Sequence, residues 1–279
     1  MKKPSWSWRI VSTLALLSAL VFAGGFVMAI VGPQGTSSAA DLTDPSNDTT
    51  PQDATTAAAS AVNTQTYPVV ALGDSLTKGV GDKNGKGYVG YLKDKLDKLG
   101  RKVSIQNLGV SGLESPELLK SVQSAGTQSI LKDAKLILIS IGGNDMTHSV
   151  GDVSQIITSG KVDEAKFLAA QDHYSKNLDG ILTSVRKANP DAPILVVGLY
   201  NPFEGVVEDP ARMNQLLDGW NENELAIVQK YPNAKVVPTF DIFEWNTDRL
   251  LSGDHFHPNE LGYDQMAERM LQALPKSIL

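Results

Sequence analysis

The sequence predicts an α/β fold, a three-layer α/β/α sandwich built on a five-stranded parallel sheet. Two observations predict it: short apolar runs alternate with helical patterns over residues 67–279, and the third and fourth runs are continuously apolar. Strands covered on both faces read as continuous apolar runs, and strand–helix alternation implies right-handed crossovers between parallel strands. The predicted strands are Val69–Leu72, Val103–Asn107, Leu136–Ser140, Ile194–Gly198 and Lys235–Pro238.

Helical patterns fill the intervals between these runs and follow the last one. Gly100 stands where the cap of the first helix is expected, and Pro258 lies just before the last helix. Ligands of open parallel sheets bind beyond the carboxyl ends of the strands, so the residues there are the candidates for a site. The predicted helices are Tyr88–Leu99, Glu114–Ser124, Glu164–Ala188, Ala211–Lys230 and Asn259–Leu274.

Composition excludes several classes of function. The chain has 279 residues, a net charge of −6 and no cysteine. An acidic chain lacks the basic face of a general nucleic-acid binder. Without cysteine there is no disulfide scaffold, thiolate metal site, cysteine nucleophile or lipid-modified N-terminal cysteine.

Residues 10–31 form a run of 22 residues without a charged side chain. As a helix this run is roughly 33 Å long, enough to cross a hydrocarbon core of about 30 Å. A cleaved signal peptide has a shorter apolar stretch of about 7–15 residues. We therefore predict a transmembrane signal-anchor over residues 10–31, with a cleaved signal peptide as the alternative.

The charges around this run predict its orientation. Residues 1–9 carry three basic side chains and no acidic one, and no Lys or Arg follows the run until Lys78. This bias predicts a cytoplasmic N-terminus and places the large domain, residues 67–279, outside the cell membrane, or secreted if the run is cleaved. Residues 32–66 are rich in Ser, Thr, Ala, Asp and Pro, a composition that predicts a disordered spacer.

Residues able to carry out nucleophilic catalysis follow the predicted strands. Ser75 comes directly after the first strand, and Asp254 and His257 follow the fifth. A serine hydroxyl is a poor nucleophile near neutral pH and needs a base within about 2.6–3.2 Å. The three-residue spacing lets Asp254 hold one imidazole nitrogen of His257 while the other faces the serine. Taken alone, Ser75 could equally be a helix N-cap.

Four short blocks resemble the SGNH (GDSL) hydrolase family. They are Gly73-Asp74-Ser75-Leu76, Asn107-Leu108-Gly109-Val110-Ser111-Gly112, Gly142-Gly143-Asn144-Asp145 and Asp254-His255-Phe256-His257-Pro258, in the family's order. The resemblance implies a flavodoxin-like sandwich and a serine esterase or lipase. It assigns the nucleophile to Ser75, the base to His257 and the orienting carboxylate to Asp254. It assigns the oxyanion hole to the N–H groups of Ser75 and Gly109 and to the side-chain amide of Asn144.

Other histidines compete for the role of base. His255 would share a face with His257 in an extended segment and is expected at the rim of the pocket. His148 is expected in an exposed loop and His173 on a helix surface. The blocks also contain two carboxylates beside the active residues, Asp74 and Asp145, and we expect these to bond loop N–H groups.

Glycine-rich stretches suggest no cofactor site. Gly79 and Gly81 begin a dinucleotide fingerprint, but Asn84 replaces its third glycine. We predict no cofactor and no metal. Two segments are candidate substrate walls, Met146–Lys161 and Tyr200–Phe203, because long loops at the catalytic edge carry specificity. Trp220 and Trp245 are expected to be packing residues.

The combined prediction is a carboxylic ester hydrolase that acts through an acyl-enzyme on Ser75. Its substrate is a small-molecule, lipid or polysaccharide ester. A general acyl esterase or lipase is the first interpretation, a carbohydrate or cell-wall O-acetylesterase the second, and a noncatalytic surface binding module the third. No nucleic-acid partner is expected, and the sequence makes no prediction of the oligomeric state.

Overall fold

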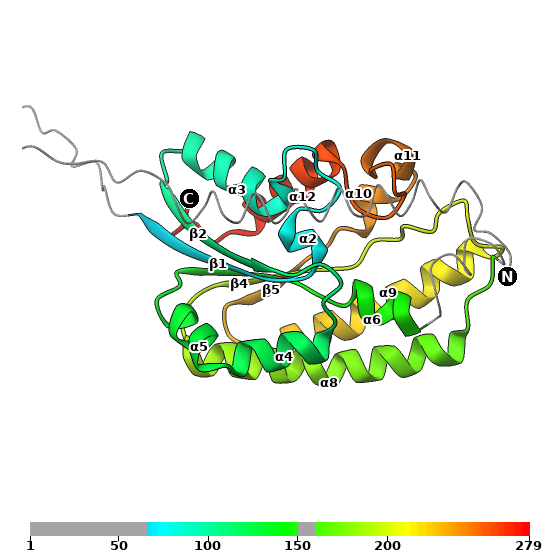
Figure 1. The fold of residues 1–279 in the computed structure, drawn as a ribbon, viewed down its shortest axis with the longest axis horizontal. Coiled ribbons are helices and arrows are strands. Elements are labelled where there is room, and N and C mark those ends of the chain that lie inside the picture. Colours follow the sequence, from blue (N-terminus) through cyan, green and yellow to red (C-terminus); the bar gives the residue numbers. More distant parts are fainter. Residues whose placement is uncertain (1–65, 150–159) are drawn as a thin grey trace, which may run out of the picture. The chain divides into compact units, whose positions relative to one another are not determined.

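Five parallel strands form a single sheet in the order β2-β1-β3-β4-β5 (Figure 1). The computed structural model describes residues 66–149 and 160–279, so the predicted anchor over 10–31 and all of the predicted spacer over 32–66 except Thr66 lie outside the described residues. Within those two ranges, no helix combines the length and apolar character that crossing a membrane requires. The strands are β1 (Tyr67–Gly73), β2 (Val103–Gly109), β3 (Leu136–Ser140), β4 (Ile194–Val197) and β5 (Ala234–Val237), which confirms the predicted sheet.

The strand order places the end of β1 between two neighbouring strand ends. β1 pairs with β2 on one side and with β3 on the other, and Gly73 is in register with Gly109 and Ser140. After β1 the chain first adds β2 on one side of it, and then adds β3, β4 and β5 in turn on the other side. Such a switch point is where open α/β sheets bind ligands, because the connections diverge there to opposite faces.

One face of the sheet is covered chiefly by α3 (Gly87–Lys98) and α12 (Glu260–Ala273) (Figure 1). Tyr88 and Tyr263 are fully buried between these helices and the sheet. Asn259 caps the start of α12, because its side chain accepts the N–H groups of Leu261 and Gly262 in the first turn. Three short helices lie on the same side: α2 (Ser75–Lys78), α10 (Phe240–Phe243) and α11 (Thr247–Leu250).

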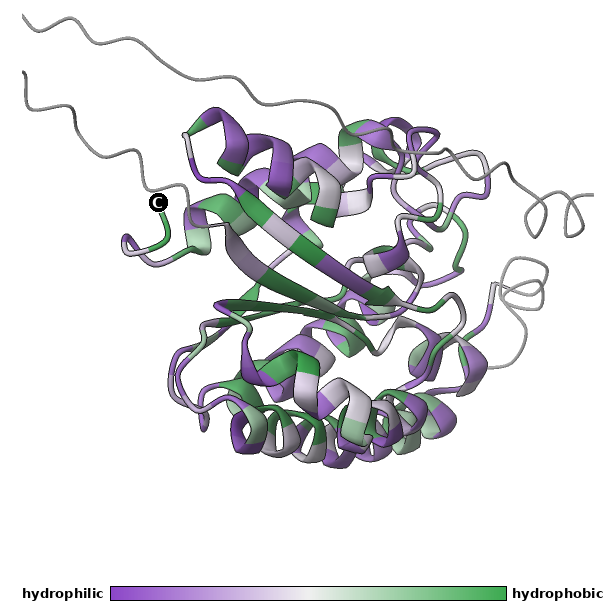
Figure 2. Ribbon diagram, turned by 60° about the vertical axis from the view of Figure 1, so that its left-hand side comes forward, coloured by the Kyte–Doolittle hydropathy of each residue, from purple (hydrophilic) through white to green (hydrophobic). Residues whose placement is uncertain are grey.

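The opposite face carries the longer helices α8 (Glu164–Ala188) and α9 (Pro210–Val228). Phe167, Tyr174 and Trp220 pack together beneath the sheet, with ring centroids 5.4 and 5.0 Å from Trp220. Figure 2 shows hydrophobic residues concentrated in the strands and hydrophilic residues on the outer faces of the helices. The same layer contains α4 (Ser115–Gln123), α5 (Ala125–Lys132) and α6 (Gly143–Ser149).

Several elements differ from the sequence prediction, among them the short helices α2, α10 and α11, which were not predicted. Ser124 ends α4 with an extended backbone, and its side chain caps α5, a helix that was not predicted. The predicted loop over Met146–Lys161 begins inside α6, so its first residues are helical. Residues 150–159 of that loop lie outside the described residues.

Candidate active site

A tight turn carries Ser75 from the end of β1 into α2. Gly73 has a φ of +137°, and a Cβ there would lie 2.0 Å from the carbonyl oxygen of Ser140, so only glycine fits. Asp74 caps α2 by accepting the N–H of Leu76 at 3.0 Å. Ser75 is therefore the first helical residue, directly beyond the sheet edge.

Asp74 is buried in a hydrogen-bond network that holds this turn. Ser140 Oγ donates to Asp74 Oδ1 at 2.7 Å and lies 2.7 Å from Thr77 Oγ1. Burial raises the pKa of Asp74 to about 6, although the bonds from Ser140 and from the Leu76 N–H act in the opposite direction. Asp145 likewise accepts the backbone N–H of Ser115, at 3.0 Å. Both carboxylates bond backbone N–H groups, as predicted, but these groups belong to the first turns of α2 and α4 rather than to loops.

Ser75, His257 and Asp254 form a continuous hydrogen-bonded chain. Ser75 Oγ lies 2.8 Å from His257 Nε2, and His257 Nδ1 lies 2.7 Å from Asp254 Oδ2. Partial burial acts to raise the pKa of Asp254, but hydrogen bonds from the His257 side chain and from the Phe256 and His257 N–H groups prevail and hold it at about 2. An ionised Asp254 favours the tautomer that carries its proton on Nδ1, which leaves Nε2 able to accept the serine proton.

The loop that carries Asp254 and His257 is closed on itself. Leu251 and Pro258 form an antiparallel bridge, and the Ser252 N–H donates to the His257 carbonyl at 2.8 Å. A Cβ at Gly81, whose φ is +92°, would lie 2.8 Å from His257 Cβ. This close approach keeps the imidazole against the neighbouring loop.

The remaining histidines lie apart from the nucleophile. His255 has a φ of +56°, so the segment is not extended as expected, and its exposed side chain lines a different cavity. His148 belongs to α6 rather than to a loop, and its Nδ1 lies 2.5 Å from Glu114 Oε1. His173 is exposed on α8, as predicted.

Two of the three predicted oxyanion donors have a free N–H among the described residues. The Ser75 N–H belongs to the first turn of α2, where it has no intrahelical acceptor. Asn144 Nδ2 donates to the Leu113 carbonyl at 2.9 Å, and because an amide carries two N–H groups, one remains for an oxyanion.

The Gly109 N–H, predicted to be an oxyanion donor, is already hydrogen-bonded within the protein. It donates to Asn107 Oδ1 at 2.9 Å, while Asn107 Nδ2 donates to the Thr77 carbonyl at 2.7 Å. A Cβ at Gly109 would lie 2.5 Å from the Lys78 nitrogen, so this glycine is needed where β2 packs against α2. The sequence block identified a position that requires glycine, but its amide is already engaged.

The turn after Gly109 offers another amide. The Val110 N–H donates to the Gly73 carbonyl at 2.9 Å, and the Leu113 carbonyl accepts the Asn144 side chain. Gly112 lies between these two anchors, has a φ of +77°, and its N–H has no acceptor among the described residues. The sequence did not distinguish Gly112 from Gly109, since both glycines belong to the same block, residues 107–112.

A small cavity of about 30 Å³ adjoins Ser75. Tyr200 lines it, whereas Phe203 is buried in the core, so only one of the two predicted wall aromatics reaches the site. Trp220 is fully buried as predicted, but the packing role expected for Trp245 is wrong, since this residue is 83% exposed. No group of three or more His, Asp or Glu side chains in the described ranges is arranged to hold a metal ion. The cavity is bounded by Asp74, Ser75, Leu76, Gly143, Asn144, Met146, Leu199, Tyr200, Pro202 and Phe256.

Comparison with known proteins agrees with this geometry. Residues 71–265 match the model of the GDSL-like lipase/acylhydrolase family. The chain belongs to this family. The predicted family and fold are therefore confirmed, and the protein is a carboxylic ester hydrolase.

The aligned region spans about three quarters of this chain and most of the length of each relative. The chain is 33% identical over 214 residues to the spore germination lipase LipC of Bacillus licheniformis, covering 75% of this chain and 96% of the relative. It is 34% identical over 212 residues to the uncharacterized protein YpmR of Bacillus subtilis, covering 75% of this chain and 81% of that relative. Among solved structures, the lipase Lip_vut3 from a goat rumen metagenome has 31% identity and a TM-score of 0.64, covering 77% of this chain and all of that one. A Clostridium thermocellum family 3 carbohydrate esterase, 17% identical with a TM-score of 0.53 over 75% of this chain and 94% of that one, shares the fold.

Proposed function

We propose that this hydrolase cleaves its ester through an acyl-enzyme on Ser75, with His257 as the base and Asp254 as the group that orients it. The observation that carries the proposal is the unbroken chain from Ser75 Oγ through His257 to Asp254, at 2.8 and 2.7 Å. Ser75 Oγ attacks the ester carbonyl carbon while its proton passes to His257 Nε2. His257 then gives that proton to the oxygen of the leaving alcohol. Water, deprotonated by the same nitrogen, then attacks the acyl-enzyme carbonyl; the bond to Ser75 Oγ breaks, His257 returns the proton to Ser75 Oγ, and the acid is released.

The negative charge on the tetrahedral intermediate needs donors aimed at its oxygen. We assign these to the N–H of Ser75, the free amide N–H of Asn144 and the N–H of Gly112, in place of Gly109. The turn that holds Gly112 is tied to Gly73 at one end and to Asn144 at the other, which supports this assignment. A donor of this type contributes about 2.7–4 kcal/mol to transition-state stabilisation.

The proposed nucleophile is tested by covalent labelling. A fluorophosphonate probe should modify the wild-type chain at Ser75 and leave Ser75→Ala unlabelled. Ser111→Ala, which removes an exposed serine from the turn after β2, is the control and should label normally. Failure of the folded wild-type protein to react would contradict the proposal and return the chain to the noncatalytic interpretation.

The acyl group is proposed to be short, of acetyl to butyryl size. The cavity beside Ser75 has about 30 Å³, and one water needs about 10–15 Å³ by the same measure, so it accepts only a few heavy atoms. This favours an O-acetylesterase-type substrate, whereas the name of the Bacillus licheniformis relative favours a lipid ester. p-Nitrophenyl esters of increasing length separate the two: kcat/KM should be highest for acetate to butyrate, and an optimum at octanoate or longer would contradict the proposal.

We also propose that the enzyme works outside the cell membrane, tethered by residues 10–31. The uncharged length of this segment and the basic residues before it support the proposal. The full-length chain should stay with membranes after carbonate washing, and protease added to intact cells stripped of their wall should remove the domain. A chain found in the soluble cell extract would contradict both the anchor and the outward orientation.

A further inference from the structure

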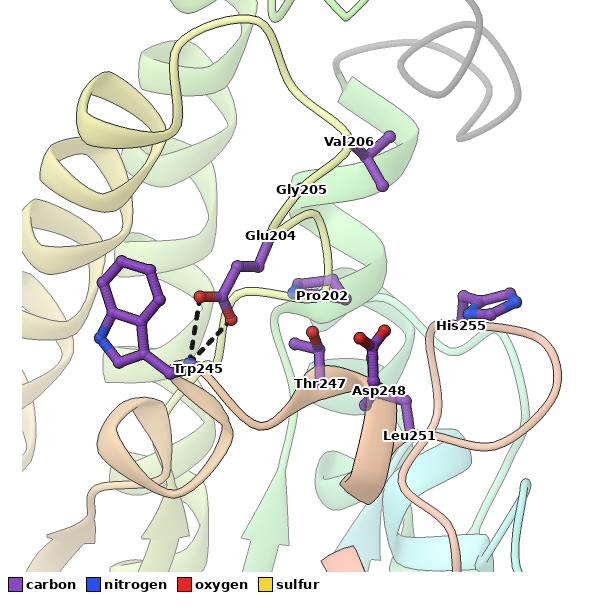
Figure 3. A pocket seen from close by; sticks show the side chains of 9 residues that line it. All are labelled: Pro202, Glu204, Gly205, Val206, Trp245, Thr247, Asp248, Leu251 and His255. Atoms are coloured by element: carbon purple, nitrogen blue, oxygen red, sulfur yellow. Dashed lines mark hydrogen bonds between the residues drawn. The ribbon is translucent and has the colours of Figure 1, made fainter.

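A second, larger cavity lies beside the site and was not predicted from the sequence. Its volume is about 510 Å³, against about 30 Å³ for the cavity at Ser75. We call it the Trp245 pocket; Pro202, Glu204, Trp245, Asp248, Leu251 and His255 form its walls. Figure 3 shows Trp245 at one end and His255 at the other, with Pro202 and Asp248 between them.

The Trp245 pocket is continuous with the proposed catalytic residues in two ways. Pro202 lines both the pocket and the small cavity at Ser75. Leu251 and His255 belong to the closed loop that carries Asp254 and His257. The pocket therefore adjoins the reacting centre on the side of the base.

The chemistry of ester cleavage assigns one half of the substrate to that side. His257 Nε2 must deliver its proton to the oxygen of the leaving alcohol, so this oxygen departs toward the base. The acyl group stays on Ser75, beside Asn144 and the small cavity. Of the two cavities, the Trp245 pocket is thus placed to receive the alcohol part of the ester.

The walls of the pocket select the chemistry of that alcohol. The indole of Trp245 is exposed, and the backbone N–H of this residue donates to both carboxylate oxygens of Glu204, at 2.9 and 3.0 Å. Glu204 and Asp248 supply acceptors for hydroxyl groups, and an exposed aromatic ring offers a flat face to the C–H groups of a sugar ring. Among the described residues no lysine or arginine lines the pocket, and two carboxylates disfavour a phosphate-bearing alcohol.

From these observations we infer that the Trp245 pocket binds the alcohol part of the ester, and that this part is a phosphate-free, hydroxyl-rich ring such as a sugar. Trp245 and Asp248 are then specificity-determining residues that lie outside the proposed triad. The inference rests on the proposed function, because it supposes ester cleavage at Ser75.

Two acetate esters with different alcohols test the pocket. Methyl 6-O-acetyl-glucopyranoside presents a sugar ring, while 2-methoxyethyl acetate has a leaving alcohol of similar type and no ring. The ratio of their kcat/KM values measures recognition of the ring and is insensitive to the amount of folded enzyme. We expect a ratio of about tenfold or more in the wild type, and a fall of about five- to tenfold in that ratio for Trp245→Ala and for Asp248→Asn.

Matched controls are available elsewhere on the surface of the protein. Leu99→Ala removes another exposed apolar side chain and Asp133→Asn another exposed carboxylate, both outside the pocket, and neither should change the ratio. A wild-type ratio near one, a ratio unchanged by Trp245→Ala, or faster cleavage of acetylcholine than of the sugar ester would overturn the inference. If Trp245→Ala instead reduces hydrolysis of p-nitrophenyl dodecanoate selectively, the pocket holds an acyl chain and the inference is wrong.

Failure of the proposed function gives a different result. In that case the wild-type protein cleaves neither acetate, nor p-nitrophenyl acetate, and Ser75 is not labelled. Cleavage of p-nitrophenyl acetate without preference for the sugar ester would leave the proposed catalysis intact and remove only the alcohol site.

Discussion

Tyr200 Oη donates a 2.6 Å hydrogen bond to the carbonyl oxygen of Phe256, the residue that precedes the proposed base. The Tyr200 ring is stacked on Phe243, with centroids 4.1 Å apart, so its hydroxyl is held by the core. Phe256 in turn packs edge-on against the His257 imidazole at 5.1 Å. The end of β4 therefore positions a loop that comes more than 50 residues later in the chain.

Removal of the Tyr200 hydroxyl should impair turnover through this positioning. Tyr200→Phe keeps the stacked ring but loses the bond to Phe256, so we expect kcat to fall several-fold with little change in KM for p-nitrophenyl acetate. Tyr231→Phe is the control, because it loses hydroxyl bonds to Thr183 and Asp179, which lie on α8 rather than in the catalytic loop. Equal losses of kcat in the two variants would show that Tyr200 acts only through stability.

The two histidines of the catalytic loop should differ sharply. His257→Ala removes the partner of Ser75 Oγ, and we expect kcat to fall by about 10⁴ or more. His255→Ala removes a side chain that points into the Trp245 pocket, and its effect on p-nitrophenyl acetate should be less than about threefold. Steady-state kinetics with both purified variants checks this. Comparable losses would mean that the wrong imidazole has been assigned as the base.

Asn144 should contribute mainly to the transition state. Asn144→Ala removes the proposed side-chain donor of the oxyanion hole, so kcat should fall by about 10²–10³ with KM changed little. Asn177→Ala, which removes a side-chain amide on α8 bonded to Ser115 Oγ, serves as the control. A loss for Asn144→Ala that appears only in KM would place this residue in ground-state binding.

A buried carboxyl group should make stability depend on pH. Glu224 lies fully buried against the Tyr174 hydroxyl, which donates to Oε2 at 2.6 Å, and burial raises the pKa of Glu224 from 4.5 to about 8. Because the folded state then holds a proton that the unfolded state releases, the free energy of unfolding should decrease as pH rises from 4.5 to about 8.

Glu224→Gln removes this titration and isolates its contribution. Relative to the wild type, the variant should gain about 1–3 kcal/mol in the free energy of unfolding between pH 5 and pH 8, as measured by urea denaturation. Glu222→Gln, an exposed change on the same helix, should show no such gain. A wild-type-minus-variant difference that stays constant with pH would contradict the raised pKa.

Local patterns were sufficient to predict the sheet and the five longest helices of the described residues. Continuous apolar runs such as Leu136–Ser140 identify strands that are buried on both faces, and strand ends identify where chemistry can occur. The helix α5 escaped detection because Ser124 is a cap shared by two helices, a role that depends on how the chain turns there. The observed boundaries of the other predicted helices and of the strands differ from the predicted ones by only a few residues.

By itself, the sequence determined the fold class and the three residues that the structure links by hydrogen bonds, because their types, order and spacing are local properties of the chain. Only the tertiary structure decided which groups are free to act. The Gly109 amide is taken by Asn107, while that of Gly112 is open, and this depends on how β2 packs against α2. Trp245 was expected to be a packing residue, yet it stands at a cavity formed by two loops about 40 residues apart. Whether a backbone amide is already hydrogen-bonded, and whether a side chain is exposed, depends on contacts between segments far apart in the sequence. The spacing of residues along the chain does not reveal these contacts.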